Sequence, residues 1–144
     1  MFPEPAPARP TPAMSYDQML EKVRYEGAYP TRERAAEAVN LVLAALGRQL
    51  TGDERVELAA RLPLEAARTF TAQIPGTQNL TGWGFVKDLA TRSGGTQATA
   101  RWDAGTVLQV VAHLAGRDLL ARIIAQLPTG FALLFGQAEL TPAA

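Results

Sequence analysis

The sequence predicts an all-α protein made of two tandem, pseudo-equivalent four-helix units that pack as one helical domain. Three observations predict this fold. Apolar residues recur at the three- and four-residue intervals of a helix, and no segment shows the alternation of a half-buried strand. Residues that cap helices precede these segments. A short apolar motif also occurs twice, with the same order of helices around it.

The first two predicted helices begin at residues that are common N-caps. Ser15 and Gln18 have the spacing of a capping box, in which two side chains satisfy free amide groups at a helix start. Gly27 is predicted to end this helix, and Thr31 is the predicted N-cap of the next. The residues expected to face the core are Tyr16, Met19, Leu20 and Val23 in the first helix, and Ala35, Val39, Val42, Leu43, Leu46 and Leu50 in the second.

The third and fourth predicted helices complete the first half of the chain. Thr51 and Glu54 have the spacing of another capping box. Pro63 suits the first turn of the fourth helix, because its missing N–H is not needed there. The stretch 71–82, which contains Pro75 and Gly76, is predicted to be a loop. The expected core residues are Val56, Leu58, Ala59 and Leu62 in the third helix, and Ala66, Ala67 and Phe70 in the fourth.

The helical pattern restarts after this loop. A short fifth helix ends at Gly94-Gly95, a longer sixth helix is broken by Gly116, and a seventh follows. Pro128 is predicted to open a last helix that ends near Phe135. The expected core residues are Phe85, Val86 and Leu89, then Val107, Leu108, Val111 and Leu114, and then Leu119, Leu120, Ile123 and Ile124.

Two segments of the chain are similar to each other. Residues 60–70 read ARLPLEAARTF and residues 125–135 read AQLPTGFALLF. Such repetition indicates a unit that cannot bury its apolar face alone and packs against its copy. We therefore expect one domain over residues 14–138, with repeats at about 15–72 and 82–138, a linker at 73–81 and a C-terminal tail at 139–144. The matching pairs are Leu62 with Leu127, Pro63 with Pro128, Ala67 with Ala132 and Phe70 with Phe135.

The first 13 residues differ from the rest because they contain five prolines. Proline fixes φ and lacks a backbone donor, so this segment is predicted to be a flexible, non-helical tail. It is either a ligand for a proline-recognising domain or a tail without a partner. Met14 could also be the initiating residue, in which case the tail would not be translated.

Composition excludes several classes of function. Lys and Arg number 14, as do Asp and Glu, and the two signs are not separated along the chain. A nucleic-acid partner, which requires a basic surface, is therefore not expected. The absence of cysteine excludes disulfides, cysteine-ligated zinc and thiol catalysis. No apolar run is long enough to span a membrane and no secretory signal is visible, so the cytoplasm is the expected location.

Four stretches of the sequence resemble a known family. These are YDQMLEKV, LVLAALGRQLTGDE, ELAARLP and a second half that ends in AQLP and LLF. Their order is similar to that of the bacterial family catalogued as domain of unknown function 2267, and the resemblance covers about residues 14–138. It implies a helical fold and offers no catalytic residues. The chain departs from the family's pattern at Gly82-Trp83-Gly84, where an acidic helix start is usual, and at Trp102, where a charged residue is usual.

No group of residues has the spacing of a catalytic, cofactor or metal site. His113 is the only histidine, and the helical projection places it toward solvent. The carboxylates suit structural roles: Asp53 and Glu54 lie in a first helical turn, where the helix dipole favours negative charge. Catalytic, cofactor-binding and metal-binding residues are therefore all expected to be absent. The remaining charged residues form predicted i, i+4 pairs, namely Glu57–Arg61, Lys22–Glu26 and Asp118–Arg122.

Trp102 is the strongest candidate for a binding residue. Trp102, Thr106, Gln109 and His113 share one helical face, opposite the apolar stripe of the same helix. An aromatic side chain on a polar face is typical of the anchors found in protein interfaces. The alternative is that a neighbouring helix or the proline-rich tail covers the ring.

These observations favour a non-catalytic helical interaction module. Its partner would be another protein or a second copy of the chain, bound through the Trp102 face. The alternative is a small-molecule-binding or enzymatic helical protein with a pocket between the repeats. A polar cavity with convergent charges at that junction would favour the alternative, and a packed apolar junction would favour the interaction module.

Overall fold

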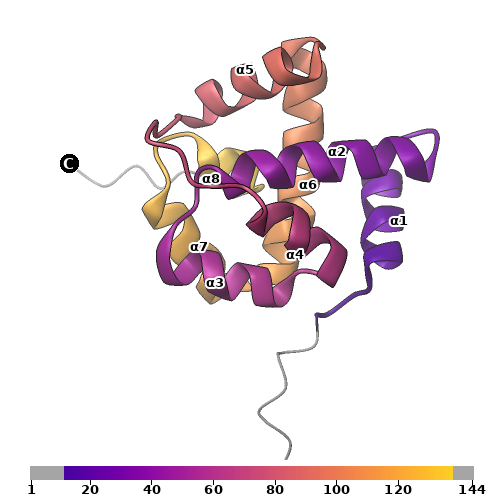
Figure 1. Cartoon of the computed structure of the whole chain (residues 1–144). Coiled ribbons are helices and arrows are strands. Elements are labelled where there is room, and N and C mark those ends of the chain that lie inside the picture. Colours follow the sequence, from indigo (N-terminus) through magenta and orange to yellow (C-terminus); the bar gives the residue numbers. More distant parts are fainter. Residues whose placement is uncertain (1–11, 138–144) are drawn as a thin grey trace, which may run out of the picture.

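The computed structural model describes residues 12–137, and these residues form eight α-helices and no strand (Figure 1). The prediction of an all-helical protein is confirmed. None of the helices in the described range is both long and apolar enough to cross a membrane. In chain order the helices are α1 (Tyr16–Glu26), α2 (Arg32–Gly47), α3 (Gly52–Arg61), α4 (Leu64–Thr71), α5 (Gly82–Ser93), α6 (Gln97–Ala115), α7 (Arg117–Gln126) and α8 (Phe131–Leu134).

The two longest helices, α2 and α6, cross at the centre of the fold (Figure 1). Helix α2 packs on α1, α4, α5 and α6, and α6 contacts α1, α5, α7 and α8 as well. Helices α3 and α7 lie side by side at the lower end of the view in Figure 1. All eight helices contribute buried side chains to one apolar cluster, in which the Phe85 and Phe131 rings meet edge to face at 5.1 Å. The two halves therefore share a core.

Most of the predicted helix boundaries and core residues are confirmed. Ser15 and Gln18 form the capping box, Gly27 is the C-cap of α1, and the Thr31 hydroxyl accepts the N–H of Arg34 at the start of α2. Gly94 ends α5 in the left-handed conformation, as glycine does at many helix ends. The predicted core residues of α2, α4, α5 and α6 are buried. Local periodicity and capping were sufficient for these elements.

The predicted capping box at Thr51 and Glu54 is wrong. The Thr51 side chain makes no capping bond, although Thr51 is the N-cap residue of α3. The side chain of Gln126, at the end of α7, instead accepts both the Thr51 N–H and the Thr51 hydroxyl. Its Oε1 accepts the Thr51 N–H at 2.8 Å, and its Nε2 donates to the Thr51 carbonyl at 2.9 Å. The start of α3 is thus fixed by a residue from the other half of the chain.

The contact between α3 and α7 also changes other predictions for these helices. Glu57 does not pair with Arg61, nor Asp118 with Arg122. Glu57 and Arg122 instead form an ion pair across the two helices, and Arg61 donates to the Ala115 carbonyl at 2.7 Å. Val56, which was expected in the core, is 69% exposed. The predicted Lys22–Glu26 pair within α1 is present at 3.4 Å.

The last helix begins later than predicted. Helix α8 starts at Phe131 rather than at Pro128, because Gly130 has a φ of +98°, which lies outside the helical region. The backbones of Gly130 and Gly82 touch at this point: a Cβ on Gly82 would lie 2.5 Å from the carbonyl carbon of Gly130, and the Gly82 N–H donates to Thr129. Glycine at position 82 therefore permits the close approach of the start of α5 to the start of α8.

Two predicted segments lie largely or wholly outside the described residues. Of the proline-rich tail, the structure describes only Pro12 and Ala13, and the C-terminal tail at 139–144 is not described. The alternative in which this tail covers Trp102 lies outside the described residues.

Candidate functional site

The four residues predicted to share a face line one groove between α1 and α6. Trp102, Thr106, Gln109 and His113 form its α6 side, and Lys22 and Glu26 of α1 form the opposite side. The groove has a volume of about 770 Å³. Small side chains line the α6 side between the longer ones. We call this concavity the Trp102 groove; its other lining residues are Ala98, Arg101, Gly105 and Val110.

One edge of the Trp102 ring is hydrogen-bonded, and much of the remaining ring is exposed to solvent. Its indole N–H donates to the Gly27 carbonyl at 2.9 Å, which fixes the ring against the turn between α1 and α2. The side chain nevertheless remains 55% exposed. A buried or half-buried tryptophan normally finds a partner for its one polar group while the ring offers apolar area. The ring is therefore held in a fixed position and retains a large apolar surface for contact.

The turn that holds Trp102 is tightly packed. A Cβ on Gly27 would lie 2.3 Å from the Tyr29 ring, so only glycine lets this ring fold back against the turn. The next residue, Ala28, has a φ of +53°, a left-handed conformation that costs about 1 kcal/mol or more for a residue with a side chain. Such outliers persist only where the surroundings determine the backbone conformation. The turn is thus a rigid support for the groove.

A buried polar network beneath the groove joins this turn to α6. Asp103 is 3% exposed, and it is the only buried charged or polar side chain in the described range. It accepts the Tyr29 hydroxyl at 2.5 Å and the Arg34 guanidinium at 3.1 Å. The Arg34 guanidinium also lies over the Tyr29 ring, 5.1 Å from its centroid. Every buried polar side-chain atom of the described residues has a hydrogen-bond partner.

The electrostatics of this network keep Tyr29 neutral and Arg34 charged. Burial raises the pKa of Tyr29 well above its usual value, and the hydrogen bond and negative charge of Asp103 raise it further. Burial opposes the charge on Arg34, but the bond to Asp103 and its charge outweigh this effect and raise the pKa of Arg34. A tyrosine hydroxyl that stays neutral and a carboxylate whose two oxygens both accept hydrogen bonds stabilise the fold and are poorly suited to proton transfer.

Asp103 was not among the residues predicted from sequence, although its position in the helix indicates that its side chain points inward. It lies four residues before Val107, on the same stripe as Val111 and Leu114, so an inward direction follows from helical geometry. A carboxylate on an inward stripe requires buried partners. Those partners, Tyr29 and Arg34, come from the other half of the chain and could not be identified from spacing.

The predicted surface position of His113 is confirmed, since its side chain is exposed. His113 lines the groove without a catalytic partner from among the charged residues there. In the described range, no group of three or more histidine, cysteine, aspartate or glutamate residues is placed to hold a metal ion. The groove lies at the junction of the two halves, where convergent charges would favour the small-molecule alternative. Its α1 charges do not converge on a ligand, because Lys22 and Glu26 pair with each other at 3.4 Å. The groove therefore offers an apolar ring, charges of both signs and hydrogen-bonding side chains on its α6 side.

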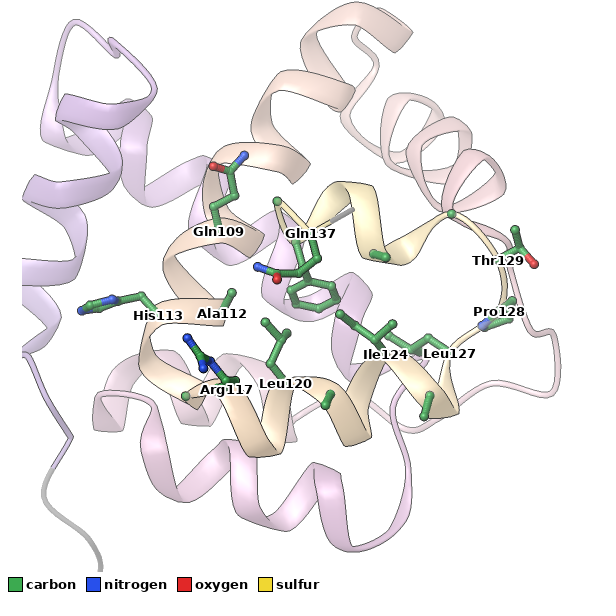
Figure 2. A pocket seen from close by; sticks show the side chains of 17 residues that line it. Gln109, Ala112, His113, Arg117, Leu120, Ile124, Leu127, Pro128, Thr129 and Gln137 are labelled. Atoms are coloured by element: carbon green, nitrogen blue, oxygen red, sulfur yellow. The ribbon is translucent and has the colours of Figure 1, made fainter. Parts of the chain in front are cut away.

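A second and larger pocket lies in the corner formed by α6, α7 and α8, with a volume of about 1210 Å³ (Figure 2). We call it the α6–α8 pocket. Its walls are mainly apolar, and it includes Leu120, Ile124, Leu127 and Phe135. All of its lining residues belong to the second half of the chain, so it is not at the junction of the halves. Sequence periodicity did not predict it, because the corner depends on how three helices meet.

One family model matches the chain over residues 16–134, and it is described as an uncharacterized conserved protein, DUF2267. The chain belongs to the DUF2267 family. The match includes α1 to α8, and with them the whole Trp102 groove and most of the α6–α8 pocket, whose lining residues Phe135, Gly136 and Gln137 lie beyond it. No curated protein matches the chain. The DUF2267 assignment confirms the resemblance drawn from the four sequence stretches and assigns no activity.

Proposed function

We propose that this DUF2267 protein is a non-catalytic interaction module whose docking surface is the Trp102 groove. The observation that carries the proposal is the state of Trp102: its ring is 55% exposed while its N–H is fixed to the Gly27 carbonyl at 2.9 Å. A rigid aromatic ring loses little conformational entropy when a partner covers it, and such residues are frequent among interface hot spots.

The partner that fits the groove best is a second copy of the chain. A symmetric contact between two copies brings the same surface to itself, so its charges must complement one another. Charges of both signs line the groove: Lys22 and Arg101 are positive, and Glu26 is negative. The chain as a whole has no net charge at pH 7, so two copies do not repel each other at long range.

Sedimentation equilibrium of the full chain over a range of concentrations tests this proposal. Trp102→Ala should weaken self-association by about 30-fold, which corresponds to a hot-spot loss of about 2 kcal/mol. The matched control is Trp83→Ala, which removes a second exposed indole, 61% accessible, that does not line the groove. Equal weakening by both variants, or a wild-type chain that stays monomeric at all concentrations, would contradict the proposal.

A second variant separates loss of contact from loss of folding. Ala98 is exposed, lines the groove and lies in the first turn of α6. Ala98→Glu places a charge in the groove, and the helix dipole favours a negative charge at this position. We expect Ala98→Glu to keep its unfolding free energy and to lose association. An unchanged dimer in this variant would mean that the contact lies elsewhere.

We also propose that the domain consists of pseudo-equivalent units at about 15–72 and 82–138, joined by residues 73–81. The support comes from the pairing of α3 with α7. At the offset of the sequence repeat, Glu57 corresponds to Arg122, and these two residues form an ion pair with each other. Likewise Arg61 corresponds to Gln126, and each bonds to the backbone just before the other's helix. Such reciprocal contacts are typical of an approximate two-fold relation.

A further inference from the structure

The α6–α8 pocket has a distribution of polarity that the proposed interaction does not use. Helix α7 presents Arg117, Leu120 and Ile124 to the pocket, at intervals of three or four residues that form one face of the helix, and its C-cap Leu127 follows them in the pocket lining. Figure 2 shows Arg117 at one end of this row, on the side of His113, and Leu127 and Pro128 at the other end. The row is thus cationic at one end and apolar along the rest.

The charges that line the pocket have one sign. Arg117 and His113 are the ionisable residues among its lining, and no aspartate or glutamate lines it. The Arg117 side chain is exposed and makes no hydrogen bond or ion pair with residues 12–137, unlike that of Arg122, which lies five residues further along α7. The charge of Arg117 is therefore available to an anionic group at this end of the pocket.

The pocket walls are apolar and firmly placed. Leu120, Leu127 and Phe135 line the pocket but are at most 9% exposed, so they form the sides of a concavity instead of a protruding surface. Small residues such as Ala121 and Ala125 leave room between them. The volume of about 1210 Å³ is slightly above the usual range for a small-molecule site.

We propose that the α6–α8 pocket binds a single-chain carboxylate of the fatty-acid class, with its carboxylate at Arg117 and its alkyl chain along Leu120, Ile124 and Leu127. The dimensions agree with this ligand. Helix α7 has ten residues and is about 15 Å long. One acyl chain of a bilayer leaflet spans about the same length, which is half of a hydrocarbon core of about 30 Å. In both the ligand and the pocket, a charged group at one end is followed by an apolar stretch of about 15 Å.

Titration calorimetry of the full chain with dodecanoate, kept below the concentration at which it forms micelles, tests this site. Wild-type protein should bind dodecanoate saturably and one to one. Arg117→Gln should weaken binding by about tenfold, as expected when a charge-assisted contact is lost. The matched control is Arg68→Gln, an exposed arginine on α4 that does not line the pocket and should leave binding unchanged.

Two further measurements distinguish this site from non-specific uptake. Dodecanol lacks the carboxylate, so its weaker binding should not respond to Arg117→Gln. Ala125→Phe, at an exposed position in the pocket wall, should fill the space and abolish dodecanoate binding without unfolding the chain. Trp102→Ala should leave dodecanoate binding unchanged, because this site does not rest on the proposed self-association. Absent or unsaturable binding, or an equal loss in the Arg117 and Arg68 variants, would overturn the proposal.

Discussion

Replacing Asp103 by asparagine tests the buried network that supports the Trp102 groove. The substitution keeps the shape of the side chain and an oxygen for the Tyr29 hydroxyl, but it removes the negative charge that faces Arg34 at 3.1 Å. Removal of one partner of a buried pair usually costs about 3–5 kcal/mol. The Arg34 side chain is 32% exposed and can recover part of its hydration. We therefore expect a loss of about 2–3 kcal/mol of unfolding free energy.

Urea denaturation followed by circular dichroism at pH 7 measures this loss. Glu26→Gln is the matched control, because it removes a carboxylate from an exposed i, i+4 pair and should cost about 0.5 kcal/mol or less. Arg34→Met and the double variant complete a cycle, and neighbouring residues of this kind should show a coupling energy of at least about 1 kcal/mol. If Asp103→Asn is as stable as the wild type, or if the two changes add independently, the network does not hold the turn to α6.

Three other predictions follow from the packing. Arg55 donates to the carbonyls of Gly47, Leu50 and Gln73, so Arg55→Met should lower the unfolding free energy by about 2–4 kcal/mol in the same urea assay. A smaller loss would show that water satisfies these carbonyls in the variant. The pKa of Tyr29 is raised in the folded chain, so above pH 10 the unfolded chain loses this proton first and stability falls with pH. Tyr29→Phe should reduce that fall by up to about 1.4 kcal/mol per pH unit in alkaline unfolding curves, and an unchanged slope would contradict the pKa assignment. Phe70→Ala and Phe135→Ala should each cost about 3–5 kcal/mol and lower one shared thermal transition, since both rings are at most 1% exposed; two separate transitions would show that the halves fold independently.

The sequence was sufficient to predict the features of the fold that depend on near neighbours. A helix repeats every 3.6 residues and its caps lie within one turn, so the stripe of α2 and the capping box at Ser15 could be read directly. The predictions failed where distant segments supply the partner. Thr51 resembles a capping residue in sequence, but Gln126 bonds its backbone from 75 positions away. Spacing alone carries no information about such a contact.

In the candidate site, too, only the features that depend on near neighbours in the sequence could be predicted. The shared face of Trp102 and His113 follows from helical geometry, whereas the contact of the indole with Gly27 depends on how α1 meets α6. Asp103 could have been recognised as inward-facing, but its partners could not have been named. The α6–α8 pocket required the relative placement of three helices, and its charge pattern became visible only when Arg117 and Leu127 were seen to line one cavity.

The most direct test of the Trp102 groove uses the two tryptophans of the chain. A ¹H–¹⁵N spectrum should contain two indole resonances, which Trp83→Phe assigns. As the protein concentration rises through the association range, we predict that the Trp102 resonance shifts or broadens while the Trp83 resonance stays in place, because a second copy covers only the ring in the groove. A Trp102 resonance that stays unchanged while sedimentation shows dimers would contradict the account.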